Sequence, residues 1–137
     1  MKAFNEDGEL KVDLLREIKK HQKADEISQG VYAEKKANGK MRLCAVGCAL
    51  YSLNEVRSKS IETNDHSAFE PELGIPWRIA RLADRIFEGL KFKEAKEFPY
   101  EFINSIPVGA DLSKVFAKFI HWLLDRKSTR LNSSHRL

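Results

Sequence analysis

The chain has 137 residues, of which 42% are hydrophobic and 32% are charged, a balance typical of one soluble globular domain. No apolar run approaches the roughly 18 residues of a membrane-spanning helix, and two cysteines are too few for a secreted disulfide scaffold. The first residues lack the apolar core of a signal peptide, so we expect a cytoplasmic protein with no membrane partner.

The formal net charge of +4 comes mostly from the end of the chain. Residues 125–135, DRKSTRLNSSH, match the translation of a common short-read sequencing adapter, although an ordinary basic tail is the alternative. Without residues 125–137 the chain has 20 basic and 19 acidic residues, so nucleic acid is not an expected partner. We therefore expect one helical domain over residues 1–124 and a non-native, disordered tail over residues 125–137.

The first predicted element is an amphipathic helix over residues 9–28, which Gly30 ends. Leu10, Leu14 and Ile18 recur at helical spacing and form its apolar stripe, with lysines on the opposite face. Such a stripe predicts packing against a second element.

His21 and Asp25 take the next two positions of this apolar stripe. Four residues apart on one helix face they can touch, and a carboxylate beside an imidazole fixes its tautomer and raises its basicity. Such a pair suits a general base or a metal ligand. The alternative is a buried pair that closes the helix end against a loop. Gln29 continues the same line by another turn.

Residues 31–43 contain Asn38-Gly39 between β-compatible flanks, which predicts a short hairpin, with a plain loop as the alternative. The next segment, residues 44–56 (CAVGCALYSLNEV), is rich in small residues and predicts a second, close-packed helix. Residues 57–67 are polar and are expected to form a loop.

Cys44 and Cys48 would face the same side of this second helix. With His21 and Asp25 they could fill a tetrahedral zinc site, although their spacing is not the CxxC that structural zinc sites use. Near a helix N-terminus, Cys44 would have a lowered pKa and could be a reactive thiolate. The alternative is that both cysteines are small buried side chains.

A third helix is predicted over residues 74–90, with Pro76 in its first turn and Gly89 near its end. Its apolar face comprises Ile79, Leu82, Ala83, Ile86 and Leu90, and its arginines are Arg78, Arg81 and Arg85. Asp84 lies on a second apolar side, so a buried Asp84 must be paired with an arginine of this helix or a group on another helix. The arginine row is expected to be a solvated face.

Residues 92–97 are expected to form a turn or two, and Pro99 opens a short helix that runs to Ile106. Asp111 then caps a last helix. The core-facing residues of that helix are Leu112, Val115, Phe116, Phe119, Ile120 and Leu123. The whole pattern predicts a mostly α fold, a small single-domain helical bundle with one short β-hairpin at most.

His66 lies in the polar loop, close in sequence to Glu70 and Glu72. It could complete a site, since functional residues often sit on loops that a rigid scaffold holds. The alternative is an exposed histidine with no role.

Four stretches, HQKADEISQGVY, CAVGCALYS, HSAFEPELGIPWRIARLADRIFEGL and EFINSIPVGADLSKVF with the later WLL, resemble a family of small uncharacterised bacterial and phage-associated proteins. The resemblance covers most of residues 12–124. No activity is attached to that family, so the resemblance implies no catalytic residue. The loop 57–65 and the lysine-rich turn 33–40 look like expansions, which leaves the spacing of the candidate site residues open.

Three functions follow as hypotheses. The first is a binding or accessory module for a small molecule or a protein partner, with a polar site between helices. Its predicted ligand-binding residues are His21, Asp25, Gln29, Tyr32, Cys48 and His66. The second is a small thiol- or metal-dependent hydrolase or transferase, with His21, Asp25 and Cys48 as candidate catalytic residues. The third is a phage-type protein that modulates a host protein.

Whether the protein is an enzyme stays open at this point. The chain has no glycine-rich phosphate loop and no HExxH or GxSxG motif, which argues against the common nucleotide-binding and hydrolase classes. A site between the first two helices would place His21 and Asp25 opposite Cys48, because a short connection favours antiparallel neighbours. Zinc is the cofactor that such a set would hold, with His21, Asp25, Cys44 and Cys48 as candidate ligands.

Overall fold

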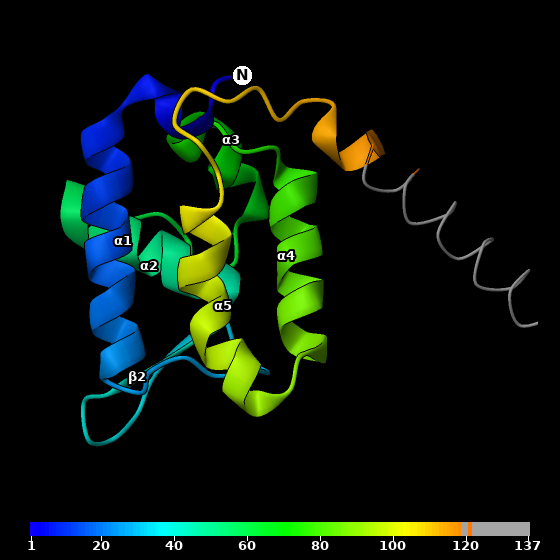
Figure 1. Cartoon of the computed structure of the whole chain (residues 1–137). Helices are drawn as coiled ribbons and strands as arrows, with labels where there is room; N and C mark the ends of the chain where they lie inside the picture. The colour runs from blue at the N-terminus through cyan, green and yellow to red at the C-terminus, as the bar shows by residue number, and fades with distance from the viewer. Residues whose placement is uncertain (119–120, 122–137) are drawn as a thin grey trace, which may run out of the picture.

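The chain folds around one almost fully buried helix, α2, as the computed structural model in Figure 1 shows for residues 1–118 and 121. The other long helices, α1, α4 and α5, all contact α2. In chain order the elements are η1 (Ala3–Glu6), α1 (Gly8–Lys23), β1 (Ala33–Lys35), β2 (Met41–Leu43), α2 (Ala45–Arg57), η2 (His66–Ala68), α3 (Phe69–Leu73), α4 (Trp77–Gly89) and α5 (Phe92–Asn104). The predicted mostly α fold with one short hairpin is confirmed.

Small residues allow close packing around α2, and a close-packed second helix is what its composition predicted. A side chain at Gly47 would overlap the backbone carbonyl of Tyr32, so only glycine lets the segment before β1 approach the first turn of α2 this closely. The Cys44 sulfur caps that turn by accepting a hydrogen bond from the Gly47 amide at 3.2 Å. Tyr32 is therefore held directly against the N-terminus of α2.

The helix α1 begins as its sequence predicts and ends earlier than expected. The Asp7 carboxylate accepts hydrogen bonds from the amides of Glu9 and Leu10 at 3.0 and 3.1 Å, which caps the first turn. The predicted helix to residue 28 is wrong, because α1 stops at Lys23 and Asp25 takes a left-handed conformation with φ of 58°.

Backbone pairing with β2 explains this early stop. The Leu43 amide donates to the Glu26 carbonyl at 2.7 Å, and the Ser28 amide donates to the Leu43 carbonyl at 2.8 Å. These bonds satisfy the backbone that a longer helix would have used. Gly30, with φ of 88°, lies in the loop that follows and does not end the helix.

The hairpin is confirmed at Asn38-Gly39. Strands β1 and β2 are antiparallel, with Ala33 opposite Leu43. Gly39 has φ of 85°, and the Asn38 side chain accepts a hydrogen bond from the Lys40 amide at 3.0 Å, the local bond for which asparagine is favoured in turns.

The helix α4 forms where it was predicted, but its buried side differs. Its buried residues are Ala80, Ala83 and Phe87, whereas Ile86 of the predicted apolar face is 40% exposed.

The helix α5 differs from its prediction. We expected a break before Pro99, but α5 runs without interruption through this residue. A proline inside a helix removes one backbone hydrogen bond. Pro99 is buried together with Ala95 and Ile103, so packing against the core offsets that loss.

The predicted last helix differs in its start and in its packing. The Asp111 carboxylate accepts a hydrogen bond from the Ser113 amide at 3.0 Å, but helical backbone begins only at Val115. Val115 is 42% exposed and does not join the core, whereas Leu112 and Phe116 are half-buried. Phe119, Ile120, Leu123 and the predicted tail, residues 125–137, lie outside the described residues. Within the described part of the chain, no helix is long and apolar enough to cross a membrane.

Candidate functional site

The structure does not bring the six predicted ligand-binding residues to one place. His21 lies at the end of α1 and Cys48 inside α2, while Asp25, Gln29 and Tyr32 lie along the loop between α1 and β1. His66 begins η2, on the other side of α2 in the sequence. Of the six residues, Tyr32 and His66 share one pocket, whereas His21 lies in a separate cluster.

Asp25 does not pair with His21 as predicted. Because α1 ends at Lys23, Asp25 leaves the helix face, and its exposed carboxylate forms an ion pair with Lys96 of α5. The hydrogen bond and charge of Lys96 lower the pKa of Asp25. Asp25 is therefore a surface residue that links the loop to α5.

Gln29 makes a structural contact with α4. Its side-chain amide donates to the carbonyls of Phe87 and Leu90 at 2.8 and 2.9 Å. These carbonyls belong to the end of α4, where helical carbonyls lack partners within the helix. Gln29 therefore caps α4 from outside.

His21 is buried between α1 and α2 with a carboxylate at each ring nitrogen. Its Nδ1 lies 2.9 Å from Glu26 Oε1, and its Nε2 lies 2.8 Å from Glu55 Oε1. The ring also meets Tyr51 edge-on, with ring centres 5.5 Å apart. We call the set Glu17, His21, Glu26, Tyr51 and Glu55 the His21 cluster, since a carboxylate oxygen of Glu17 also lies within 4.8 Å of the ligand atoms of His21 and Glu55.

The two carboxylates bound to His21 differ in their pKa. Burial alone would raise the pKa of Glu26, but the Met41 amide, which donates to its Oε2 at 2.6 Å, and His21 lower it below its usual value. Burial raises the pKa of Glu55 against the opposing effect of His21, and the neighbouring carboxylate of Glu17 adds to the rise. In the cluster, hydrogen bonds therefore stabilise the charged form of Glu26, whereas the carboxylates of Glu17 and Glu55 lie close together and disfavour each other's charge.

Sequence reasoning missed all of these acids. Glu26 lies within the helix that the sequence predicts over residues 9–28. On such a helix, a residue five positions after His21 cannot reach the His21 side chain. It reaches His21 because the chain reverses at Asp25. Glu55 lies on α2, 34 positions away, and only helix packing brings it to His21.

Both cysteines are buried, and neither resembles a reactive thiolate. Burial, with a contribution from Asp84, raises the pKa of Cys44 to about 12, so the predicted lowered pKa is wrong. Burial raises the pKa of Cys48 further, and the charges of Glu55 and Glu26 act in the same direction. An apolar environment outweighs the field of the helix N-terminus here.

The predicted zinc set is not assembled. Among the described residues, the side chains that bring at least three metal-ligating atoms together are Glu17, His21 and Glu55. That group contains neither cysteine, and Asp25 is replaced by acids from α1 and α2. His21 is thus the one predicted metal candidate that stands in a group of this kind.

Tyr32 and His66 do come together, in a second site. Their rings meet edge to face with centres 5.8 Å apart. They line an open pocket of about 520 Å³ that we call the His66 pocket. Its lining comprises Tyr32, Asn64, Asp65, His66, Ser67, Trp77, Arg81, Asp84 and Arg85. Three segments meet there: the end of the loop before β1, the loop leading into η2, and the exposed face of α4.

Asp84 is the acid that α4 contributes to this pocket, and its partner is His66 from another element. His66 Nε2 lies 3.8 Å from Asp84 Oδ2, an ion-pair separation longer than a hydrogen bond. The other oxygen, Oδ1, is buried and accepts no hydrogen bond within the described part of the chain. We predicted a paired Asp84; the pairing is present but loose.

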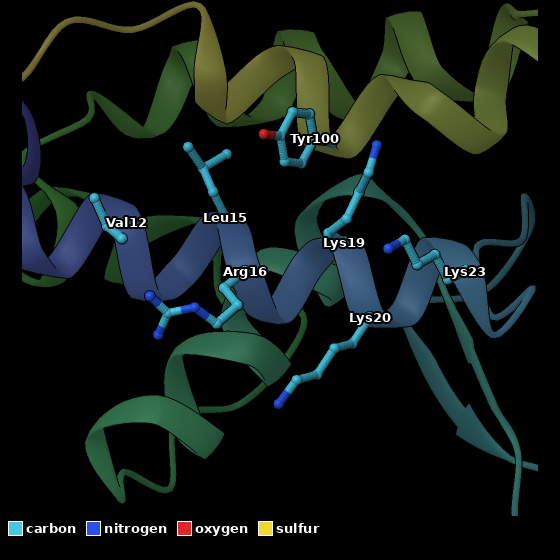
Figure 2. A pocket seen from close by; sticks show the side chains of 7 residues that line it. All are labelled: Val12, Leu15, Arg16, Lys19, Lys20, Lys23 and Tyr100. Atoms are coloured by element: carbon cyan, nitrogen blue, oxygen red, sulfur yellow. The ribbon is translucent and has the colours of Figure 1, made fainter.

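A third feature is the basic groove between α1 and α5, of about 410 Å³. It is lined by Val12, Leu15, Arg16, Lys19, Lys20, Lys23 and Tyr100. Figure 2 shows Lys19 reaching toward Tyr100 while Arg16 and Lys20 point to the opposite side of α1. Arg16 and Lys20 pair with Asp13 and Glu17, each at 3.3 Å. Because its cations diverge and half are paired, the groove is a solvated helix face.

Comparison with known proteins finds no match to this chain among family models, curated proteins or solved structures. Any inference about function therefore rests on the residues of the two histidine sites.

Proposed function

We propose that the protein is a binding module that holds a small organic anion in the His66 pocket. The observation that carries this proposal is the convergence of Arg81 and Arg85, one helical turn apart on α4, with Tyr32 and His66 in one open polar pocket of about 520 Å³. Pockets of this size suit a small molecule.

The charges of the pocket favour an anionic group. A guanidinium offers paired donors that match the oxygens of a carboxylate or phosphate, and two of them one turn apart can hold a single anion. The acids of the pocket have protein partners: the Asp65 carboxylate accepts the Ser67 amide at 3.0 Å, and Asp84 faces His66. The two arginines are exposed, and neither acid of the pocket forms an ion pair with them.

The walls of the pocket favour a ligand with a flat body. Trp77 and Tyr32 both line the pocket, and the Arg81 guanidinium lies 5.7 Å from the Trp77 ring centre. That contact keeps Arg81 near the ring by a cation–π interaction. The proposed ligand therefore carries a carboxylate or phosphate on a ring that can stack.

The test is a titration of the full chain with inorganic phosphate and with phenyl phosphate, followed by two-dimensional amide NMR. We expect saturable shifts at Tyr32, His66 and Arg81, with tighter binding of phenyl phosphate. A variant carrying Arg81→Gln and Arg85→Gln should bind at least about tenfold more weakly, a loss of roughly 1.4 kcal/mol.

Arg78→Gln is the matched control, because Arg78 lies on the same helix and contacts Trp77 but does not line the pocket. It should bind phenyl phosphate as the unmodified chain does. Shifts that appear only outside the pocket, or equal losses in the control and the double variant, would exclude this function.

A metal-dependent hydrolase or transferase is the second candidate, and the grouping of Glu17, His21 and Glu55 is the observation that favours it. The thiol-dependent form loses support, since both thiols are buried and have raised pKa values. The metal-dependent form requires that the His21 cluster bind a metal ion.

A further inference from the structure

We propose that the His21 cluster binds one divalent first-row transition-metal ion through His21 Nε2 and the carboxylates of Glu17 and Glu55, with Glu26 as the positioning residue. This proposal concerns a different site from the His66 pocket and does not depend on the proposed function.

The three ligand groups are already close enough for one ion. Their ligating atoms all lie within 4.8 Å of one another. An ion bound at about 2.0–2.2 Å from each nitrogen or oxygen separates its ligands by roughly 3–4 Å. Small rotations of the two glutamate side chains are therefore enough to reach coordination distances, with no movement of the backbone.

The ligands stand on rigid elements. Glu17 and His21 are one turn apart on α1, and Glu55 faces them from α2. These helices are also joined by the ion pair between Asp13 and Arg57 at 2.9 Å. Sites built on packed helices hold their geometry better than sites on loops.

Glu26 sets the direction of the imidazole. Its Oε2 accepts the Met41 amide and its Oε1 faces His21 Nδ1, so this carboxylate acts as an acceptor on both sides. A metal ion bound at Nε2, the nitrogen that faces Glu55, would leave Nδ1–H to donate to Glu26. A carboxylate behind a histidine in this way is the usual partner of a metal-ligating imidazole.

The cluster has more acidic groups than cations close to it. Nε2 of His21 lies 2.8 Å from Glu55 Oε1, the carboxylates of Glu17 and Glu55 are neighbours, and Lys20 pairs with Glu17 at 3.3 Å. One divalent ion at Nε2 would face the carboxylates of both Glu17 and Glu55 and reduce the repulsion between them.

The ion can reach the site from solvent. The Glu55 side chain is 38% exposed, whereas those of Glu17 and His21 are 15% and 8% exposed. Water can therefore complete the coordination shell on the Glu55 side. One imidazole and two carboxylates without a thiolate suit Zn²⁺, Mn²⁺, Fe²⁺ or Co²⁺.

The experiment measures metal binding by the full chain with Mn²⁺, Zn²⁺ and Co²⁺, using calorimetry, thermal unfolding and NMR of the histidine rings. We expect one equivalent to bind, the melting temperature to rise by several degrees at about 100 times the Kd, and the His21 Nε2 resonance to shift or broaden. The Co²⁺ form should show no thiolate charge-transfer band.

Variants separate the cluster from other histidines and acids. Glu55→Gln and Glu17→Gln, which are conservative changes at partly exposed positions, should each weaken binding at least about tenfold. Glu97→Gln is the matched control, since Glu97 is an exposed helical carboxylate outside the cluster. A thiolate band, a ring shift confined to His66, or equal affinity of Glu55→Gln and the control would overturn the proposal, as would no binding at about 1 mM metal.

The phosphate titration is followed at Tyr32, His66 and Arg81, and the metal titration is followed at His21. Either test can therefore fail without the other. Metal binding without phosphate binding would support this site and reject the proposed function. The reverse result would reject the metal site alone.

Discussion

The His21 cluster and the His66 pocket both place a histidine beside an acid, yet the two sites differ in depth and in contact. The His21 side chain is 8% exposed and has a carboxylate within hydrogen-bonding distance of each ring nitrogen. The His66 side chain is 18% exposed and has one carboxylate at 3.8 Å. The first is enclosed by two helices, and the second borders an open pocket. Equal residue types thus give a tightly held imidazole in one place and an accessible one in the other.

The acids of each site also act on a buried cysteine. Asp84 of the His66 pocket contributes to the raised pKa of Cys44, and Glu55 and Glu26 of the His21 cluster contribute to that of Cys48. Burial is the larger cause for both thiols. The two cysteines therefore belong to the packed interior that separates the sites and not to either surface.

The largest expected effect is that the two buried thiols react slowly with an alkylating reagent. A rise in the pKa of Cys44 from 9.0 to about 12 lowers the thiolate fraction at neutral pH about a thousandfold. Alkylation by iodoacetamide at about pH 8 should be at least about 100-fold slower in the native chain than in guanidinium. Rapid modification of one thiol in the native chain would show that the reagent reaches this thiol and that it is not protected by burial.

Gly47→Ala should disturb the His66 pocket and leave the His21 cluster unchanged. The new methyl group would overlap the Tyr32 carbonyl, so the free energy of unfolding should fall by about 3 kcal/mol. The Tyr32 and His66 resonances should move while those of His21 stay. Gly89→Ala, where no atom lies within 4 Å of the added carbon, is the control and should change stability by less than about 1 kcal/mol. Similar losses in both variants would contradict the close approach.

Replacing each histidine by leucine compares the two sites directly. His21→Leu should lower the free energy of unfolding by about 2 kcal/mol, because Glu26 and Glu55 lose their partner in a part-buried place. His66→Leu should cost less than about 1 kcal/mol, since its ion pair is long and its ring borders solvent. Urea unfolding curves measure both values. A larger cost at His66 would reverse our ranking of the sites.

The smallest expected effects concern Glu26 and Glu55, the two acids that contact His21. They should differ in how the free energy of unfolding depends on pH, measured in buffer that contains a chelator. The lowered pKa of Glu26 gives stability that is present above its unfolded value of 4.5 and is lost as the pH falls through the folded value. The raised pKa of Glu55 acts oppositely: its contribution is present below 4.5 and is lost as the pH rises through the folded value.

Glu26→Gln should therefore cost about 1 kcal/mol at neutral pH, and less in acid. Glu55→Gln should leave stability within about 0.5 kcal/mol at neutral pH, because Glu55 is partly exposed and its ionised form is already disfavoured. Unfolding curves at several pH values test the difference. Parallel pH profiles for the two variants would show that the acids are equivalent.

Local patterns account for what the sequence predicted well. The apolar stripe of α1, the Asn38-Gly39 turn and the small residues of α2 each depend on neighbours within a few positions. Errors occurred where a distant contact prevailed over a local preference. Pairing of Glu26 and Ser28 with Leu43 ends α1 early, and burial of Pro99 keeps α5 continuous.

The candidate sites follow the same division. Sequence singled out His21 from its place on an apolar stripe and His66 from its place in a polar loop, and it included Tyr32 among the ligand-binding residues. It gave His21 the wrong acid and placed all of them in one site. It also assigned the arginines of α4 to solvent, because nothing near them in the chain indicates that Tyr32 and His66 lie opposite.

The amino-acid sequence by itself determined the helical class, the close-packed second helix and the odd position of His21, since periodicity and side-chain size are properties of short segments. The tertiary structure alone decided which acids meet each histidine and that Tyr32, His66 and the α4 arginines share a pocket. Such contacts join residues up to 53 positions apart, as between Tyr32 and Arg85, and depend on how the helices pack. No spacing rule within one element can express them.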